Sequence, residues 1–197
     1  MKIKICGITN MEDADYSILK GAEFIGVILD KKIKRHGDED LIKEIKKIHP
    51  DIKVVGVYTD MPVNRDINED ILQLHFPHTS RDIIHVKNEF KKEIISVINI
   101  NNENYLDKLK EYIGAGSDYI LLEDKNGIIN DREKISQLNM KRIAIAGKID
   151  SRNITALIPL NPAFIDISSS LEERIGKKSF KKIDELFNMI GDINVIR

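Results

Sequence analysis

Eight short runs of branched aliphatic residues recur along the chain, and several of them show no polar alternation. This pattern is typical of strands that are buried on both faces of a parallel sheet. The chain shows no sequence repeat of the kind found in solenoid proteins. The sequence therefore predicts strands over residues 2–8, 23–29, 53–59, 71–75, 93–100, 118–123, 142–147 and 163–170.

Amphipathic segments separate these runs and predict helices. Thr9 and Asn10 precede the first segment, and either residue is a suitable N-cap. The stretch 61–70, after the third run, is a weak candidate because it is short and contains a proline. The predicted helices cover residues 11–22, 38–49, 80–90, 102–116, 131–138, 151–158 and 179–190.

The alternation of strand and helix predicts an α/β fold with a parallel sheet and crossover helices. Eight such units favour a closed (β/α)8 TIM barrel, a single domain over residues 1–197 with short loops and some degenerate helices. The alternative is a doubly wound open sheet, which usually has five or six strands. In a barrel, the loops after the strands build the functional site, so the strand-end residues are the candidates.

Composition narrows the function classes. Charged residues make up 32% of the 197, but 31 basic and 32 acidic side chains nearly cancel, which gives no support for a nucleic-acid partner. A single cysteine excludes an internal disulfide framework and favours a reducing compartment. No signal peptide and no run near the roughly 20 apolar residues of a membrane helix are found, so we expect a cytoplasmic protein without a membrane partner.

The only cysteine, Cys6, ends the first apolar run, immediately before a Gly-Ile-Thr-Asn segment. A free cysteine is most often a small buried hydrophobe. At the end of a barrel strand it is also a candidate reactive group, provided that its thiol can ionise.

The strand ends KICGIT, GVILDKKIKRH, VVGVYTD, LQLH, YILLED, IAG and IDISSSLEERIGKKSFKKI follow one another in this order. Over nearly the whole chain this order resembles phosphoribosylanthranilate isomerase, the (β/α)8 barrel of tryptophan biosynthesis. The resemblance implies an Amadori rearrangement of N-(5-phosphoribosyl)anthranilate to carboxyphenylamino-deoxyribulose phosphate. It implies no cofactor and no metal, a small phosphorylated sugar as substrate, and a chain that is a monomer or a homodimer.

The rearrangement needs an acid that protonates the ring oxygen and a base that removes a proton from C2 of the sugar. The resemblance makes Cys6 the base. For the acid, the family's strand-six aspartate falls on Glu123, and Asp124 follows it. A one-residue bulge would bring Asp124 inward instead, and we expect Asp124 to be the acid, with Glu123 as the alternative. The alternative without a catalytic role is that both carboxylates lie on a loop and are exposed to water.

Further residues match the family's binding motifs. Arg35 falls on the arginine that holds the anthranilate carboxylate, unless it belongs to an exposed basic loop. Gln73 and His75 end the fourth strand, where the histidine serves either the substrate or the barrel mouth. The phosphate is expected after strands seven and eight, against backbone N–H groups. The expected residues there are Gly147, Lys148, Ser168, Ser169 and Ser170, and Asp166 is expected to pack and hydrogen-bond beneath the site.

The chain departs from the family's pattern at several places. The glycine-rich stretch after the acid is replaced by KNGIINDREK, and Lys148 replaces one glycine after strand seven. A non-catalytic or repurposed barrel that binds a phosphorylated sugar is therefore the alternative function. A related sugar isomerase of histidine biosynthesis usually has an aspartate where this chain has Cys6. A doubly wound signalling domain leaves the last strands unexplained, and both monomers and homodimers fit the sequence.

Overall fold

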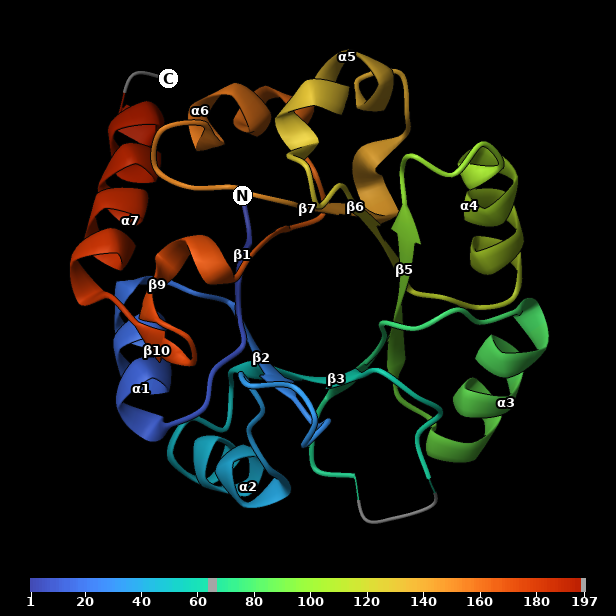
Figure 1. The fold of residues 1–197 in the computed structure, drawn as a ribbon, viewed down its shortest axis with the longest axis horizontal. Helices are drawn as coiled ribbons and strands as arrows, with labels where there is room; N and C mark the ends of the chain where they lie inside the picture. Colours follow the sequence, from blue (N-terminus) through green and yellow to red (C-terminus); the bar gives the residue numbers. More distant parts are fainter. Residues whose placement is uncertain (64–66, 196–197) are drawn as a thin grey trace.

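Eight parallel strands form a closed barrel in this computed structural model, which describes residues 1–63 and 67–195 (Figure 1). The strands follow one another around the ring in sequence order, and β1 pairs with both β2 and β8. The predicted barrel is confirmed and the open sheet is excluded. The strands are β1 (Ile3–Cys6), β2 (Phe24–Ile28), β3 (Lys53–Tyr58), β4 (Ile71–Leu74), β5 (Glu93–Asn99), β6 (Tyr119–Glu123), β7 (Ile143–Ala146) and β8 (Ile165–Ile167).

Helices surround the barrel on its outside (Figure 1). Asn10 is the N-cap of the first one and accepts a hydrogen bond from the backbone N–H of Asp13 at 2.9 Å, which decides between the two predicted caps. The helices are α1 (Met11–Lys20), α2 (Glu39–Ile48), α3 (Ser80–Phe90), α4 (Tyr105–Gly114), α5 (Arg132–Ile135), α6 (Ile154–Leu157) and α7 (Phe180–Val195). Between β3 and β4, residues 61–63 and 67–70 form no helix, and the rest of the weak segment, 64–66, lies outside the described residues.

Short 3-10 turns replace parts of the predicted later helices. The predicted helix 131–138 is reduced to α5 after a 3-10 turn, and the predicted helix 151–158 is reduced to α6, as expected for degenerate units. After β8 the chain forms another 3-10 turn and a small antiparallel hairpin before α7. The 3-10 turns are η1 (Ile128–Asp131), η2 (Met140–Arg142), η3 (Ile158–Leu160) and η4 (Ser169–Leu171), and the hairpin strands are β9 (Glu172–Arg174) and β10 (Lys177–Lys178).

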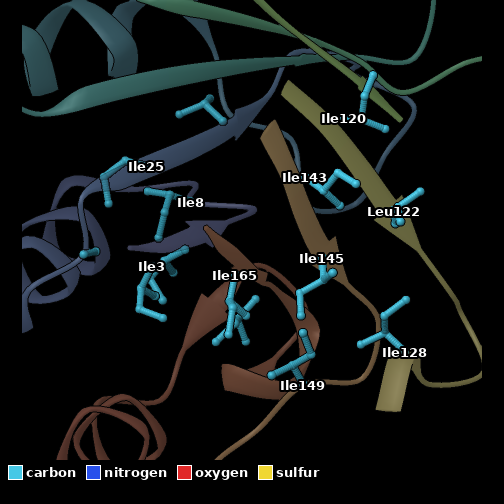
Figure 2. Close-up of a cluster of buried hydrophobic side chains, with 14 of the residues drawn as sticks. Ile3, Ile8, Ile25, Ile120, Leu122, Ile128, Ile143, Ile145, Ile149 and Ile165 are labelled. Atoms are coloured by element: carbon cyan, nitrogen blue, oxygen red, sulfur yellow. The ribbon is translucent and has the colours of Figure 1, made fainter. Parts of the chain in front are cut away.

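Alternate residues of each strand face two different layers. One set packs with the helices, and Figure 2 shows part of it, with Ile3, Ile25, Ile143 and Ile165 on neighbouring strands. The other set fills the barrel interior and forms a separate apolar cluster. That cluster consists of Cys6, Phe24, Ile28, Val55, Val57, Ile71, Ile95, Leu121, Ala144, Ala146 and Phe164.

Aromatic rings occupy the end of the barrel where the strands begin. Phe164 precedes β8 and is fully buried, with its ring centroid 5.0 Å from that of Phe24 and 5.5 Å from that of Tyr119. Pairs at such spacings stabilise a core beyond their buried area. This end is therefore packed shut, and a site in the barrel interior opens at the opposite end. In the described part of the chain, no helix is long and apolar enough to cross a membrane.

Replacement of Phe164 tests this packing. Phe164→Ala is expected to lower the free energy of unfolding by about 3–5 kcal/mol, because a buried ring is lost and the rigid barrel cannot close the cavity. Urea denaturation followed by circular dichroism measures the change. Leu19→Ala, on a side chain that is 77% exposed, is the control and should change stability by less than ~0.5 kcal/mol. Equal effects of the two variants would contradict the assigned interior packing.

Candidate active site

The alternation along the strands places five polar or reactive side chains inside the barrel, between the buried aromatic rings and the carboxyl ends of the strands. Lys4 and Cys6 lie two residues apart on β1, and Gln73 lies on β4. Glu123 ends β6, two residues after the interior Leu121, and Asp166 lies on β8. These side chains come from four strands of one ring, and Cys6 and Glu123 are the last residues of theirs.

Cys6 lies beside Lys4 over a glycine of the next strand. A Cβ added to Gly26 would lie 2.8 Å from Cys6 Sγ and 3.1 Å from Lys4 Cε, so this glycine leaves the space that both side chains fill. Burial raises the pKa of the Cys6 thiol, and the positive charges of Lys4 and Lys178 oppose this rise without overcoming it. The cysteine is therefore a protonated thiol at neutral pH, with an ammonium ready to stabilise its thiolate.

Lys4 is fully buried and depends on its partners. Its ammonium donates to Asp166 Oδ2 at 2.7 Å and to Gln73 Oε1 at 2.8 Å. Burial alone lowers the pKa of Lys4, but the negative charges of Asp166 and of a Cys6 thiolate outweigh burial and raise the pKa above its ordinary value. The lysine is a permanent positive charge in the barrel interior. Asp166 thus lies in the barrel interior, bound to Lys4.

A second chain of contacts leads from Gln73 to the sixth strand. Gln73 Nε2 lies 3.2 Å from His75 Nδ1, and His75 Nε2 lies 3.5 Å from Glu123 Oε2. Burial raises the pKa of Glu123, but its hydrogen bond to His75 and nearby positive charges, those of Lys125 and Lys4 among them, outweigh burial and lower the pKa overall. His75 therefore contacts a carboxylate at the barrel mouth.

Asp124 lies elsewhere. Its Oδ1 accepts hydrogen bonds from Asn101 Nδ2 and from the backbone N–H of Asn126, both at 2.9 Å, so its side chain holds the loops after β5 and β6 together. It follows an interior residue in a strand where neighbours face opposite ways. The expectation that a bulge brings Asp124 inward is not supported by this position, and of the two neighbouring carboxylates Glu123 is the one that shares the interior with Cys6.

Lys178 is a site residue that the sequence analysis missed. Its fully buried ammonium donates to the carbonyl oxygens of Cys6 at 2.7 Å and Ser168 at 3.1 Å, and lies 3.4 Å from Glu172 Oε1. Burial lowers its pKa, although Glu172 opposes this change. The adjacent backbone N–H of Lys178 donates to Asp13 Oδ2 at 2.8 Å, so the hairpin is anchored to α1.

Arg35 comes from the loop after β2 and reaches the end of β8. Its Nη1 donates to Ser168 Oγ at 3.2 Å and lies 3.7 Å from Glu172 Oε1. Ser168 Oγ in turn donates to the carbonyl oxygen of Cys6 at 3.0 Å. The arginine is therefore held beside the cysteine, and its guanidinium has further N–H groups that these contacts leave available.

The loops after β7 and β8 meet at the residues expected to bind phosphate. Gly147 has φ +129°, and a Cβ there would lie 2.0 Å from the carbonyl oxygen of Asp124, so only glycine fits. Lys148 is exposed and adopts a left-handed conformation with φ +48°. Ser170 donates through its hydroxyl to the carbonyl oxygen of Ile149, while Ser169 is exposed. Hydroxyl contacts of Ser168 and Ser170 thus hold loops, which leaves backbone N–H groups for an anion.

Metal ligation has no counterpart in the described parts of the chain, where no group of three or more His, Cys, Asp or Glu side chains could hold an ion. The site instead contains an interior thiol, two interior carboxylates and three basic side chains, which come from different strands and loops: Cys6, Glu123, Asp166, Lys4, Arg35 and Lys178. A (β/α)8 barrel with such groups at the carboxyl ends of its strands belongs to the class of barrel enzymes whose site is built there.

Comparison with known proteins identifies the family. Residues 3–189 match the family model described as N-(5'phosphoribosyl)anthranilate (PRA) isomerase. The N-(5'-phosphoribosyl)anthranilate isomerase of Thermoplasma volcanium is 38% identical over 194 residues, which cover 98% of this chain and 97% of that protein. The chain belongs to the N-(5'-phosphoribosyl)anthranilate isomerase family, and the family predicted from the strand ends is confirmed.

Solved structures agree on the fold. The phosphoribosyl anthranilate isomerase of Thermus thermophilus superposes with a TM-score of 0.82 at 22% identity, covering 98% of this chain and 100% of that chain. A phosphoribosyl anthranilate isomerase in complex with reduced 1-(o-carboxyphenylamino)-1-deoxyribulose 5-phosphate superposes with a TM-score of 0.77 at 24% identity, covering 98% and 99%.

The titration of Cys6 tests the electrostatics of the site. Because burial raises its pKa, the folded protein should titrate above the ordinary thiol value of 9.0, and the urea-unfolded chain near that value. Carbon-13 NMR of a labelled Cys6 Cβ follows both transitions without interference, since the chain has one cysteine. By linkage, this thiol stabilises the fold at pH below its unfolded pKa, and that contribution is lost as pH rises through the folded pKa. A folded midpoint below 9.0 would contradict the assignment.

Proposed function

We propose that the protein isomerises N-(5'-phosphoribosyl)anthranilate to carboxyphenylamino-deoxyribulose phosphate, with Cys6 as the general base and Glu123 as the general acid. The observation that carries the assignment of roles is that these two side chains share the interior face of the barrel at its carboxyl end. They come from β1 and β6, and two other strands, β7 and β8, separate them on the shorter way around the ring. A small sugar between them would have one group on each side.

The chemistry requires a proton at the ring oxygen and removal of a proton from C2. Glu123 donates a proton to the ring oxygen and the ring opens to a protonated imine, from which the Cys6 thiolate removes the C2 proton to give the neutral enol-amine. The enol-amine tautomerises to the ketone of carboxyphenylamino-deoxyribulose phosphate. Both groups are partly or fully withdrawn from water, which strengthens their interaction with the charges that develop on the substrate. Lys4 stabilises the Cys6 thiolate from beneath, since its charge is already felt at the sulfur.

The two pKa shifts define the proton state of the pair. The raised pKa of Cys6 and the lowered pKa of Glu123 mean that at neutral pH the pair carries one proton, on the sulfur. The reactive arrangement carries that proton on the carboxylate. A thiolate of high pKa is a strong base towards a C–H bond, so a small reactive population remains effective.

The remaining candidates bind the two ends of the substrate. Arg35 reaches the site beside Cys6 with N–H groups available for the anthranilate carboxylate, which a guanidinium grips with two parallel hydrogen bonds. Backbone N–H groups of Gly147 and of the Ser168–Ser170 segment receive the phosphate, and Lys148 adds a positive charge at the rim. A cytoplasmic enzyme, monomeric or homodimeric, remains the expectation from the sequence.

A sugar-phosphate binder without turnover is the second candidate. The observation that favours it is Lys148, whose exposed side chain stands where the family pattern has a glycine. Such a protein would bind a product analogue while leaving the substrate unchanged, so a binding measurement beside the assay separates the two functions.

An assay of single variants tests the catalytic roles. The substrate is generated in place and the loss of its fluorescence is followed. Cys6→Ser and Glu123→Gln should each lower kcat at least ~100-fold, since a general acid or base contributes 10²–10⁴-fold. Asp124→Asn is the matched control, because it removes the neighbouring carboxylate, and it should retain most of the activity.

The outcomes separate the alternatives. An inactive Asp124→Asn beside an active Glu123→Gln would transfer the acid to Asp124. A wild-type protein that binds reduced carboxyphenylamino-deoxyribulose phosphate but shows no turnover would replace the isomerase by the binder. Circular dichroism of each variant excludes loss of the fold as the cause.

Lys148 is tested by a change in binding rather than in rate. Lys148→Asn removes the charge and retains a residue that tolerates the left-handed conformation. Loss of one phosphate contact should raise KM about tenfold, equivalent to ~1.4 kcal/mol, with kcat little changed. Lys181→Asn, on the exposed face of α7, is the control and should leave both constants unchanged. An unchanged KM in Lys148→Asn would remove this lysine from the phosphate site.

A further inference from the structure

We propose that Gln73 is a positioning residue that holds His75 in a single tautomer, and that His75 thereby determines which oxygen of Glu123 carries the transferable proton. The tautomer follows from hydrogen-bond directions alone. Only its last step, the proton on Glu123, rests on the proposed function.

The direction of the chain is set at Lys4. An ammonium has donors and no acceptor, so the Gln73 atom 2.8 Å from Lys4 Nζ must be the amide oxygen. The orientation of an amide is otherwise ambiguous, and here the lysine removes the ambiguity. Lys4 cannot turn away, because it is fully buried and its ammonium also donates to Asp166 Oδ2 at 2.7 Å.

The amide then sets the histidine. With its oxygen directed to Lys4, Gln73 presents its NH2 group to His75 Nδ1 at 3.2 Å. An NH2 group only donates, so Nδ1 must be the unprotonated, accepting nitrogen. The proton of the neutral ring is therefore on Nε2. Gln73 is itself 1% exposed, which holds its side chain in this position.

The protonated nitrogen faces the carboxylate. His75 Nε2 lies 3.5 Å from Glu123 Oε2, and a protonated Nε2 is the donor of the hydrogen bond between the two side chains. Since Oε2 accepts from the ring, a proton on Glu123 is carried by Oε1. The charged groups that face the ring are Glu123 at Nε2 and Lys4 beyond the Gln73 amide. A buried lysine thus orients the acid through two neutral side chains.

The predicted role of Gln73 in substrate binding changes accordingly. Both ends of its amide are already used within the barrel, the oxygen by Lys4 and the nitrogen by His75. Its effect on the reaction therefore passes through His75, and its replacement should alter the rate of the bound substrate more than its binding.

Nitrogen-15 NMR of the substrate-free protein tests the tautomer of His75 independently of any enzymatic activity. The chain has five histidines, and His75 is assigned from the signals lost in His75→Asn. In the wild type at neutral pH, we expect a protonated Nε2 and an unprotonated Nδ1. A protonated Nδ1 beside an unprotonated Nε2 would overturn the proposal, whatever the enzyme turns over.

Two replacements of Gln73 test its control of the ring. Gln73→Glu presents an acceptor to Nδ1, so Nδ1 should become protonated. Gln73→Met removes the donor, so the nitrogen-15 chemical shifts of the two ring nitrogens should move towards the average expected for a mixture of tautomers. Gln137→Glu, which adds the same charge on an exposed residue, should leave the His75 signals unchanged. His75 signals that are the same in all variants would overturn the proposal.

Kinetics of the same proteins separate this inference from the proposed function. Gln73→Met should lower kcat about tenfold with KM changed less than about twofold, a split that a general loss of folding would not give. An unchanged kcat together with a mixed tautomer would overturn the link to Glu123. A wild type without turnover would contradict the proposed function, and the NMR result would still decide the tautomer.

Discussion

The burial of one ammonium group constrains the whole interior of this barrel. A charge inside a protein is tolerated only with partners, and Lys4 finds them on β4 and β8. The requirement places Asp166 and Gln73 around it and leaves the sulfur of Cys6 against its stem. The side chains of the candidate active site are therefore positioned by Lys4, a residue with no exposure to solvent.

The positive charge of Lys4 affects both the proposed base and the proposed acid. Towards β1 it favours the thiolate of Cys6, and towards β6 it acts through Gln73 and His75 on Glu123. A second buried lysine, Lys178, holds the backbone of Cys6 from the side of the hairpin. Positive charge is thus fixed in the scaffold, where it costs no reorganisation during a reaction.

The repeating apolar runs were sufficient to predict the barrel, because strands buried on both faces read as uninterrupted aliphatic segments. The order of the strand ends also predicted the family. The orientation of Asp124 could not be read from the sequence, since adjacent carboxylates differ only in which face they take, and that depends on the register of β6. Lys4 was hidden within an apolar run, although its spacing of two from Cys6 indicates the same face. Lys178 was hidden by tertiary contacts, since its partners are 10 and 172 residues away.

The seam between the first and last strands has a consequence for how the chain is made. Lys4 and Asp166 are 162 residues apart, so the partner of this lysine is among the last parts of the barrel to leave the ribosome. Until β8 arrives, β1 can bury its lysine only without its carboxylate, which is strongly unfavourable. Closure is therefore a late, non-local step, and contacts of such long separation slow folding. The ion pair between Lys4 and Asp166, which organises the site, can therefore form only after β8 has been synthesised.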